Sequence, residues 1–232
     1  MLKRKKKTGN SIARRNRIAL GTLCLIGSAA FAGTANAGLV LYSQLPDQAN
    51  GWFADSSGSN ANFRHADSFS LGSAATIGQI EFWGAYLPAN MAVPDNFTIN
   101  IFADDLGLPG NALLTTSLSN LTRTDTGVDF FGFDEYMYTA ELTTFFAADA
   151  GTTYWFSITN DTGLGPDGTW FWETGFGADG LNAQSSDFGA SWHNNQGDLA
   201  FVLKTPVPAP GALALLGISG LVCGRSRRRK KN

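Results

Sequence analysis

The sequence predicts an all-β body, folded as a two-sheet antiparallel sandwich of the jelly-roll type. Apolar and polar residues alternate over several runs, which is the pattern of half-buried strands. Turns rich in Gly, Pro and Asp separate these runs, and no amphipathic helix of more than three turns stands out between them. About eight to ten strands joined by such turns suit two packed sheets, whereas a repeat array would need a fixed period.

The alternation is clearest in residues 79–86, where Ile80, Phe82, Gly84 and Tyr86 share one face. The other clear runs are residues 97–103, 153–159 and 199–203. Further candidate strands are residues 39–42, 67–71, 113–118, 135–142 and 169–173. Turn-forming residues fill 104–110 and 160–168, so these segments are expected to connect strands.

The N-terminus has the three parts of a secretory signal peptide. Two basic clusters, residues 3–7 and 14–17, precede an apolar stretch over residues 18–31. Ala35-Asn36-Ala37 then matches an A-x-A cleavage site. Residues 1–37 are therefore predicted to be a signal peptide with a helical apolar part. A secretion translocase and a signal peptidase would process it after Ala37, which leaves Gly38 as the new N-terminus.

The C-terminal residues 205–232 also divide into three parts. A proline element, Val207-Pro208-Ala209-Pro210, precedes an apolar run over residues 211–224. A basic end follows, and it includes Arg227, Arg228 and Arg229. The apolar run predicts a short hydrophobic helix, although it falls below the ~20 residues that a helix needs to cross a bilayer. Positive residues favour the cytoplasmic side, so the tail predicts a membrane stage during sorting.

This tail resembles the PEP-CTERM sorting signal, which is also called the ice-binding protein C-terminal domain. The resemblance implies export, a transient stay in the inner membrane and processing by an exosortase-like enzyme. The final location would be the cell surface or the extracellular matrix. Ala209 stands where the family has Glu, which suggests a variant of the processing enzyme.

The body is similar to a β-sandwich that recurs in exported bacterial proteins with this tail. The similarity implies a fold and export, but no activity. The residues that support it are 66–69, 80–84, 94–97, 101–105 with 108–110, and 151–155.

Between the two end segments, residues 38–204 form a strongly acidic body. Only Arg64, Arg123 and Lys204 are basic there, against all 19 acidic residues, which leaves the body near −16. This charge argues against nucleic acid as a partner, because phosphate binding needs a basic patch. Both cysteines, Cys24 and Cys223, lie outside the body, so a hydrophobic core rather than a disulfide must hold this single domain together.

Few residues in the body suit catalysis, so we expect it not to be an enzyme. It has two histidines, His65 and His193, and no cysteine, which gives little basis for a Ser-His-Asp site or a zinc site. A glycoside hydrolase would need two carboxylates across a cleft, and a chain with 19 acidic residues always offers some such pair.

Two turns could supply oxygen ligands to calcium, the one cofactor that the sequence leaves open. Asp104 and Asp105 flank the first turn, and Asp161 and Asp167 flank the second. The alternative is that these side chains shape the turns through local hydrogen bonds.

Aromatic residues suggest a carbohydrate-binding alternative. Trp83, Trp155, Trp170 and Trp172 lie in predicted strands, where exposed rings could stack on the sugars of a polysaccharide, and core packing is the competing role. The leading hypothesis is an exported, non-enzymatic surface or matrix protein. The alternative is a lectin-like module, with or without calcium, and a secreted glycoside hydrolase comes third.

Overall fold

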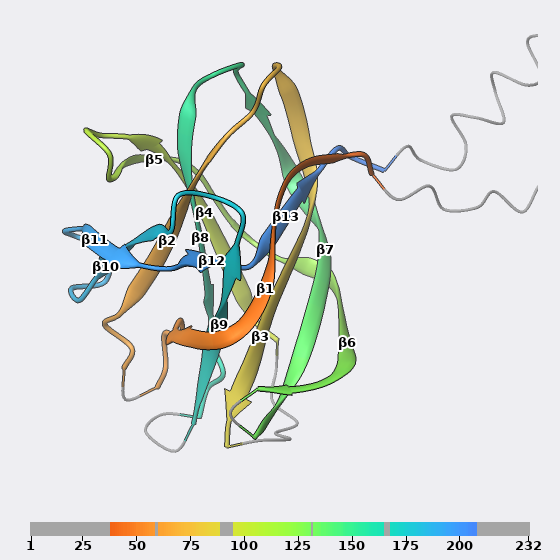
Figure 1. The fold of residues 1–232 in the computed structure, drawn as a ribbon, viewed down its shortest axis with the longest axis vertical. Helices are drawn as coiled ribbons and strands as arrows, with labels where there is room; N and C mark the ends of the chain where they lie inside the picture. Colours follow the sequence, from red (N-terminus) through yellow and green to blue (C-terminus); the bar gives the residue numbers. More distant parts are fainter. Residues whose placement is uncertain (1–37, 59, 89–94, 131, 165–167, 208–232) are drawn as a thin grey trace, which may run out of the picture. The chain divides into compact units, whose positions relative to one another are not determined.

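The computed structural model describes residues 38–58, 60–88, 95–130, 132–164 and 168–207 (Figure 1). All regular elements in these ranges are β-strands, which confirms the all-β prediction. The strands are β1 (Val40–Phe53), β2 (Arg64–Ser70), β3 (Ala75–Leu87), β4 (Phe97–Asp104), β5 (Pro109–Ser117), β6 (Ser119–Phe130), β7 (Phe133–Ala148), β8 (Thr153–Asn160), β9 (Thr169–Phe176), β10 (Leu181–Ser185), β11 (His193–Gln196), β12 (Asp198–Leu199) and β13 (Phe201–Lys204).

The strands form two antiparallel sheets packed as a sandwich, as predicted (Figure 1). Sheet A has seven strands in the order β12-β9-β1-β13-β3-β7-β6. Sheet B has six strands in the order β11-β10-β2-β8-β4-β5. The chain crosses between the sheets repeatedly, because β1, β3, β7 and β13 belong to sheet A while β2, β4, β8 and β10 belong to sheet B.

Two short strands share the space between β1 and β3 in sheet A. β13 pairs with the first part of β1 through Val40 and Gln44, and β9 pairs with the later part through Gly51 and Phe53. β3 likewise pairs with β13 up to Phe82 and with β9 from Gly84 onward. The two strands therefore continue one another in the sheet, and the break between them falls near Ala200.

The core lies between the inward faces of the two sheets. Ile80, Phe82 and Tyr86 of β3 are buried there, as the alternation predicts. The ring of Phe82 stacks on Tyr138, with 4.8 Å between their centroids. Trp170 meets Phe97 edge-on at 4.9 Å, so aromatic pairs join the two sheets.

Helices were expected at the two ends of the chain, in the signal peptide and in the sorting tail. Both segments lie outside the described residues. Within the described ranges, no helix has the length and apolar character that crossing a membrane requires.

Candidate functional site

The four tryptophans proposed as a sugar platform are all buried. Trp170 and Trp172 have no exposed surface, while Trp155 is 5% and Trp83 is 7% exposed. Trp170 and Trp172 do share a strand face, but that face points into the core. Stacking on a sugar requires an accessible ring, so the expectation of an exposed platform at these four residues is wrong.

Trp83 and Trp155 lie outside the main core and are covered by neighbours on the outer faces of the sheets. Ala200, Val202 and Met137 surround Trp83 on sheet A. Phe102, Leu108 and Trp192 pack around Trp155 on sheet B. Strand alternation places a side chain on one face of a sheet, but it does not say what folds over that face.

The predicted calcium turns do not gather their acidic residues. Asp104 Oδ1 accepts a hydrogen bond from Trp155 Nε1 at 2.8 Å, and its Oδ2 accepts one from the Gly107 amide. Asp161 Oδ1 accepts a bond from the Gly163 amide, and Asp105 is exposed. In the part of the chain that the structure describes, no three His, Cys, Asp or Glu side chains are grouped to hold a metal. Asp167 lies outside that part.

The signal and sorting residues fall mostly outside the described ranges. Ala35, Ala37, Pro208, Ala209, Pro210, Arg227, Arg228 and Arg229 all lie there. Gly38 and Val207 are described, and hydrogen bonds join the two chain segments next to them. The Leu39 amide donates to Thr205 Oγ1 at 2.9 Å, and the Thr205 amide donates to the Leu39 carbonyl at 2.9 Å.

We call these hydrogen bonds between Leu39 and Thr205 the terminal pair. It continues the β1–β13 ladder, in which Val40 lies opposite Lys204. The first and last described residues therefore meet at the same place on sheet A, at the upper right of Figure 1. The two predicted address segments would both leave the sandwich from that place.

Gly38 fits closely beside the terminal pair. A Cβ at this position would lie 2.0 Å from the Thr205 carbonyl oxygen, so a side chain has no room. The Gly38 amide donates to Gln79 Oε1 at 3.4 Å. Gln79 also lines a cavity of about 300 Å³ with Asn120, Thr122, Thr139, Ala140 and Glu141. We call this space the terminal cavity.

All three basic residues of the body are engaged in internal contacts. Lys204 forms an ion pair with Glu81. Arg64 donates from Nη1 to the carbonyls of Ala61 and Phe63. Arg123 Nη1 lies 3.1 Å from Asp95 Oδ1, so none of the three is a free cation for an anionic ligand.

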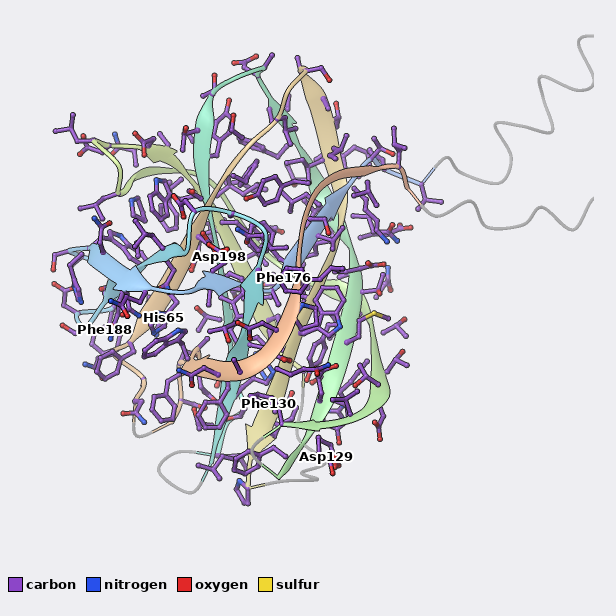
Figure 2. The ribbon with its side chains drawn as sticks, in the orientation of Figure 1. His65, Asp129, Phe130, Phe176, Phe188 and Asp198 are labelled. Carbon is purple, nitrogen blue, oxygen red and sulfur yellow. The ribbon has the colours of Figure 1, made fainter. Side chains whose placement is uncertain are left out.

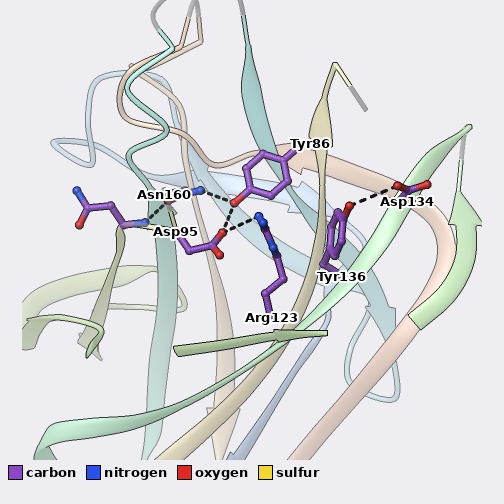
Figure 3. Close-up of polar contacts among 7 residues, drawn as sticks. Tyr86, Asp95, Arg123, Asp134, Tyr136 and Asn160 are labelled. Carbon is purple, nitrogen blue, oxygen red and sulfur yellow. Dashed lines mark hydrogen bonds and ion pairs between the residues drawn. The ribbon is translucent and has the colours of Figure 1, made fainter. Parts of the chain in front are cut away.

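Arg123 belongs to a polar cluster that includes Tyr86, Asp95 and Asn160 (Figure 3). Its guanidinium lies between the rings of Tyr86 and Tyr136, at 5.4 and 5.1 Å from their centroids. The Tyr86 hydroxyl donates to Asp95 and accepts a bond from Asn160 Nδ2 at 3.1 Å. Burial, together with the neighbouring Tyr138 and Asp95, raises the pKa of Tyr86, so it stays a neutral donor.

A buried carboxyl pair was missed from the sequence. Glu135 on β7 is 2% exposed and Glu173 on β9 is fully buried. Burial and the nearby Glu135 raise the pKa of Glu173 to about 9. The pair resembles a catalytic dyad in composition, but solvent does not reach it. Nothing in the local sequence signals the contact, because the two residues are far apart along the chain.

The two histidines lie in one row of sheet B, each opposite Gln184 of β10. His65, which is labelled in Figure 2, is buried. Its ring stacks on Trp52, with 5.4 Å between the ring centroids. Burial lowers the pKa of His65 to about 4, so it is neutral at physiological pH. His193 is exposed on β11. In the part of the chain that the structure describes, neither ring is hydrogen-bonded to a serine or a carboxylate. His65 Nδ1 lies 3.3 Å from Asn182 Oδ1.

The outer face of sheet B holds a partly exposed aromatic pair that was not predicted. Trp192 meets Phe102 edge-on at 5.7 Å, and both rings are partly accessible. Polar side chains lie near them on the same face. One continuous row across the sheet contains Asn194, Ser157, Asn100 and Thr115, together with Ala183 and Ala66.

Comparison with curated proteins and with solved structures gives no match. Residues 40–210 match the family described as Domain of unknown function (DUF7901). This range contains β1 to β13 and ends close to the boundary expected for the body. Because the match covers well over half of the sequence, the chain belongs to this family.

Proposed function

We propose that this protein is an exported, non-enzymatic protein of the cell surface or extracellular matrix, directed by its C-terminal signal. The observation that supports this best is the terminal pair between Leu39 and Thr205. Both address segments attach at this pair, outside the strands that form the core. The body would therefore keep its ladder hydrogen bonds when either segment is removed.

The sandwich order supports a jelly-roll body for this role. The strands β1-β13-β3-β7 are neighbours in sheet A, and β2-β8-β4-β5 are neighbours in sheet B. Such an interleaved pair of four-strand sheets is the arrangement of a jelly roll. Its acidic surface favours solubility after export.

The test compares the full chain with a chain that lacks residues 208–232, both produced in cells that have the processing enzyme. We expect the full chain to reach the surface or the medium without residues 1–37, and the shortened chain to stop elsewhere while still resisting protease. Intact mass gives the processing and cell fractionation gives the location. An Arg227→Ala, Arg228→Ala, Arg229→Ala variant should behave like the deletion, whereas Ser226→Ala, which keeps the basic end, should not. Recovery of a surface species that still ends at Asn232 would refute sorting by the tail.

A second candidate function is the binding of a neutral polysaccharide, supported by the Trp192–Phe102 pair. The partly accessible rings offer an apolar surface, and Asn100, Thr115 and Asn194 offer amide and hydroxyl groups on the same face. Calcium assistance through Asp104 and Asp105 would require their loop to rearrange, because both carboxylate oxygens of Asp104 already accept hydrogen bonds. The net charge of the body disfavours anionic polymers.

A pull-down with insoluble neutral polysaccharides, with and without a calcium chelator, tests this candidate. Trp192→Ala should abolish retention, while Phe188→Ala, another exposed aromatic residue, should leave it intact. Equal retention of both variants would contradict binding at this face.

A further inference from the structure

Signal-peptide removal would create a new charged group beside Gln79, which lines the terminal cavity. Cleavage after Ala37 converts the Gly38 amide into an α-ammonium, which has more donors and a positive charge. The Gly38 nitrogen already faces Gln79 Oε1 at 3.4 Å. Because Gln79 lines the cavity, the new ammonium would form at the edge of the cavity.

The side chains around the cavity suit a cation. Gln79 lies directly opposite Glu141 on β7 and opposite Lys204 on β13. Lys204 is already paired with Glu81, so its charge is compensated. Glu141 is exposed and has no side-chain hydrogen bond or ion pair in the described part of the chain. Glu81, Glu141 and Lys204 are the charged side chains that β3, β7 and β13 present here.

We propose that the terminal cavity is a binding site for the α-ammonium of the processed chain, with Gln79 and Glu141 as its acceptors. This inference rests on the proposed export and on cleavage after Ala37. The terminal pair holds Leu39 in place, so the ammonium has little freedom to leave. Gly38 is needed because any side chain would meet the Thr205 carbonyl.

With this site, binding of the new N-terminus would depend on the position at which the signal peptide is cut. A cut one residue earlier would move the charge away from Gln79, and a cut one residue later would remove Gly38 altogether. Only the Gly38 terminus combines the close approach to Thr205 with an ammonium at the cavity. The processed form should consequently hold its first strand more firmly than the precursor does.

The test uses the full chain, processed by the producing cells and recovered by fractionation. Intact mass first establishes whether Gly38 is the N-terminus. An amine-reactive reagent at pH 7 then labels the protein, and peptide mass spectrometry gives the labelling rate of the Gly38 amine. A nearby carboxylate raises the pKa of an amine and so lowers the fraction that can react.

We expect Glu141→Gln to raise the labelling rate about two- to fivefold, the range for a solvent-exposed ion pair. Gln79→Leu should raise it as well, and Asp105→Asn, which removes an exposed carboxylate on the other sheet, should not. Resistance of each variant to protease confirms that it is folded. Equal labelling rates in the parent and in both cavity variants would overturn the site while leaving export intact. An N-terminus other than Gly38 would overturn the site together with the predicted cleavage.

Discussion

The carboxyl groups of Glu135 and Glu173 meet on sheet A although their strands do not pair. β3 separates them, since Tyr136 and Trp172, their immediate neighbours in sequence, both pair with Gly84. The Oε2 atoms of both residues are buried, and neither has a hydrogen-bond partner in the described part of the chain. Two such groups can share one proton, which leaves the pair with a single negative charge.

This pair predicts a loss of stability at high pH. Burial and Glu135 raise the pKa of Glu173 from 4.5 to about 9, so folding favours its protonated form. The resulting stabilisation is complete below about pH 4.5 and is lost as the pH rises towards 9. Glu173→Gln keeps a neutral side chain and should flatten this dependence, by about 1–3 kcal/mol between pH 5 and 9.

Urea unfolding followed by tryptophan fluorescence over this pH range measures the effect. Asp149→Asn provides the control, because Asp149 is an exposed carboxylate in the turn between β7 and β8. If the parent and Glu173→Gln have parallel pH profiles, the two carboxyl groups do not share a proton.

His65 is expected to make folding stability fall as the pH is lowered, the opposite of the effect of Glu173. Burial lowers its pKa from 6.5 to about 4, so folding favours the neutral ring. Its contribution is complete above pH 6.5 and is lost as the pH falls towards 4, by up to about 3 kcal/mol. His65→Gln should reduce the slope between pH 6.5 and 4. His193→Gln should reduce it less, because repulsion from His193 lowers the pKa of His65 less than burial does. An unchanged slope in His65→Gln would show that folding does not lower the pKa of the ring.

Most strands that the sequence predicted have two neighbours or a buried face, and the edge strand β5 is an exception. Phe97, Ile99 and Ile101 alternate because β4 lies over the core, and residues 97–103 were identified for that reason. β6, β10 and β11 were missed. They are edge or near-edge strands rich in Ser, Asn, Thr and Gln. The buried residues of β10 are Asn182, Ala183 and Ser185, so the hydrophobic period that predicts a strand is weak even where the strand is buried.

The predicted tryptophan platform and calcium turns differ from the structure for another reason. Alternation placed Trp155 correctly on the face opposite Tyr154 and Phe156, but the loop that includes Trp192 folds over it from more than thirty residues away. The acidic residues of the turns were identified, but their hydrogen bonds to Trp155 and to local amides depend on the folded geometry. A single sequence does not contain these distant contacts.

Gly84 predicts a strict size limit in the middle of sheet A. A Cβ at this position would lie 2.2 Å from the Phe171 carbonyl oxygen and 2.4 Å from the ring of Trp170. Gly84→Ala should therefore lower the free energy of unfolding by about 1–3 kcal/mol, as overpacking does. Gly72→Ala is the matched control, because a Cβ there meets nothing within 4 Å. Thermal unfolding of the two variants decides this, and equal melting temperatures would mean that β3 and β9 are farther apart than the structure shows.

Arg123 allows its charge and its ring contacts to be tested separately. Arg123→Lys keeps a positive charge near Asp95 but loses the planar group between Tyr86 and Tyr136. Cation–π contacts at partly exposed sites contribute about 0.5–1 kcal/mol each, so we expect Arg123→Lys to cost about 1 kcal/mol. Arg123→Leu also leaves Asp95 without its cation and should cost more. Urea unfolding at low and high salt distinguishes the ion pair from the ring contacts, because added salt weakens an ion pair more than a ring contact. If Arg123→Lys were as stable as the parent, the ion pair with Asp95 alone would account for the role of Arg123.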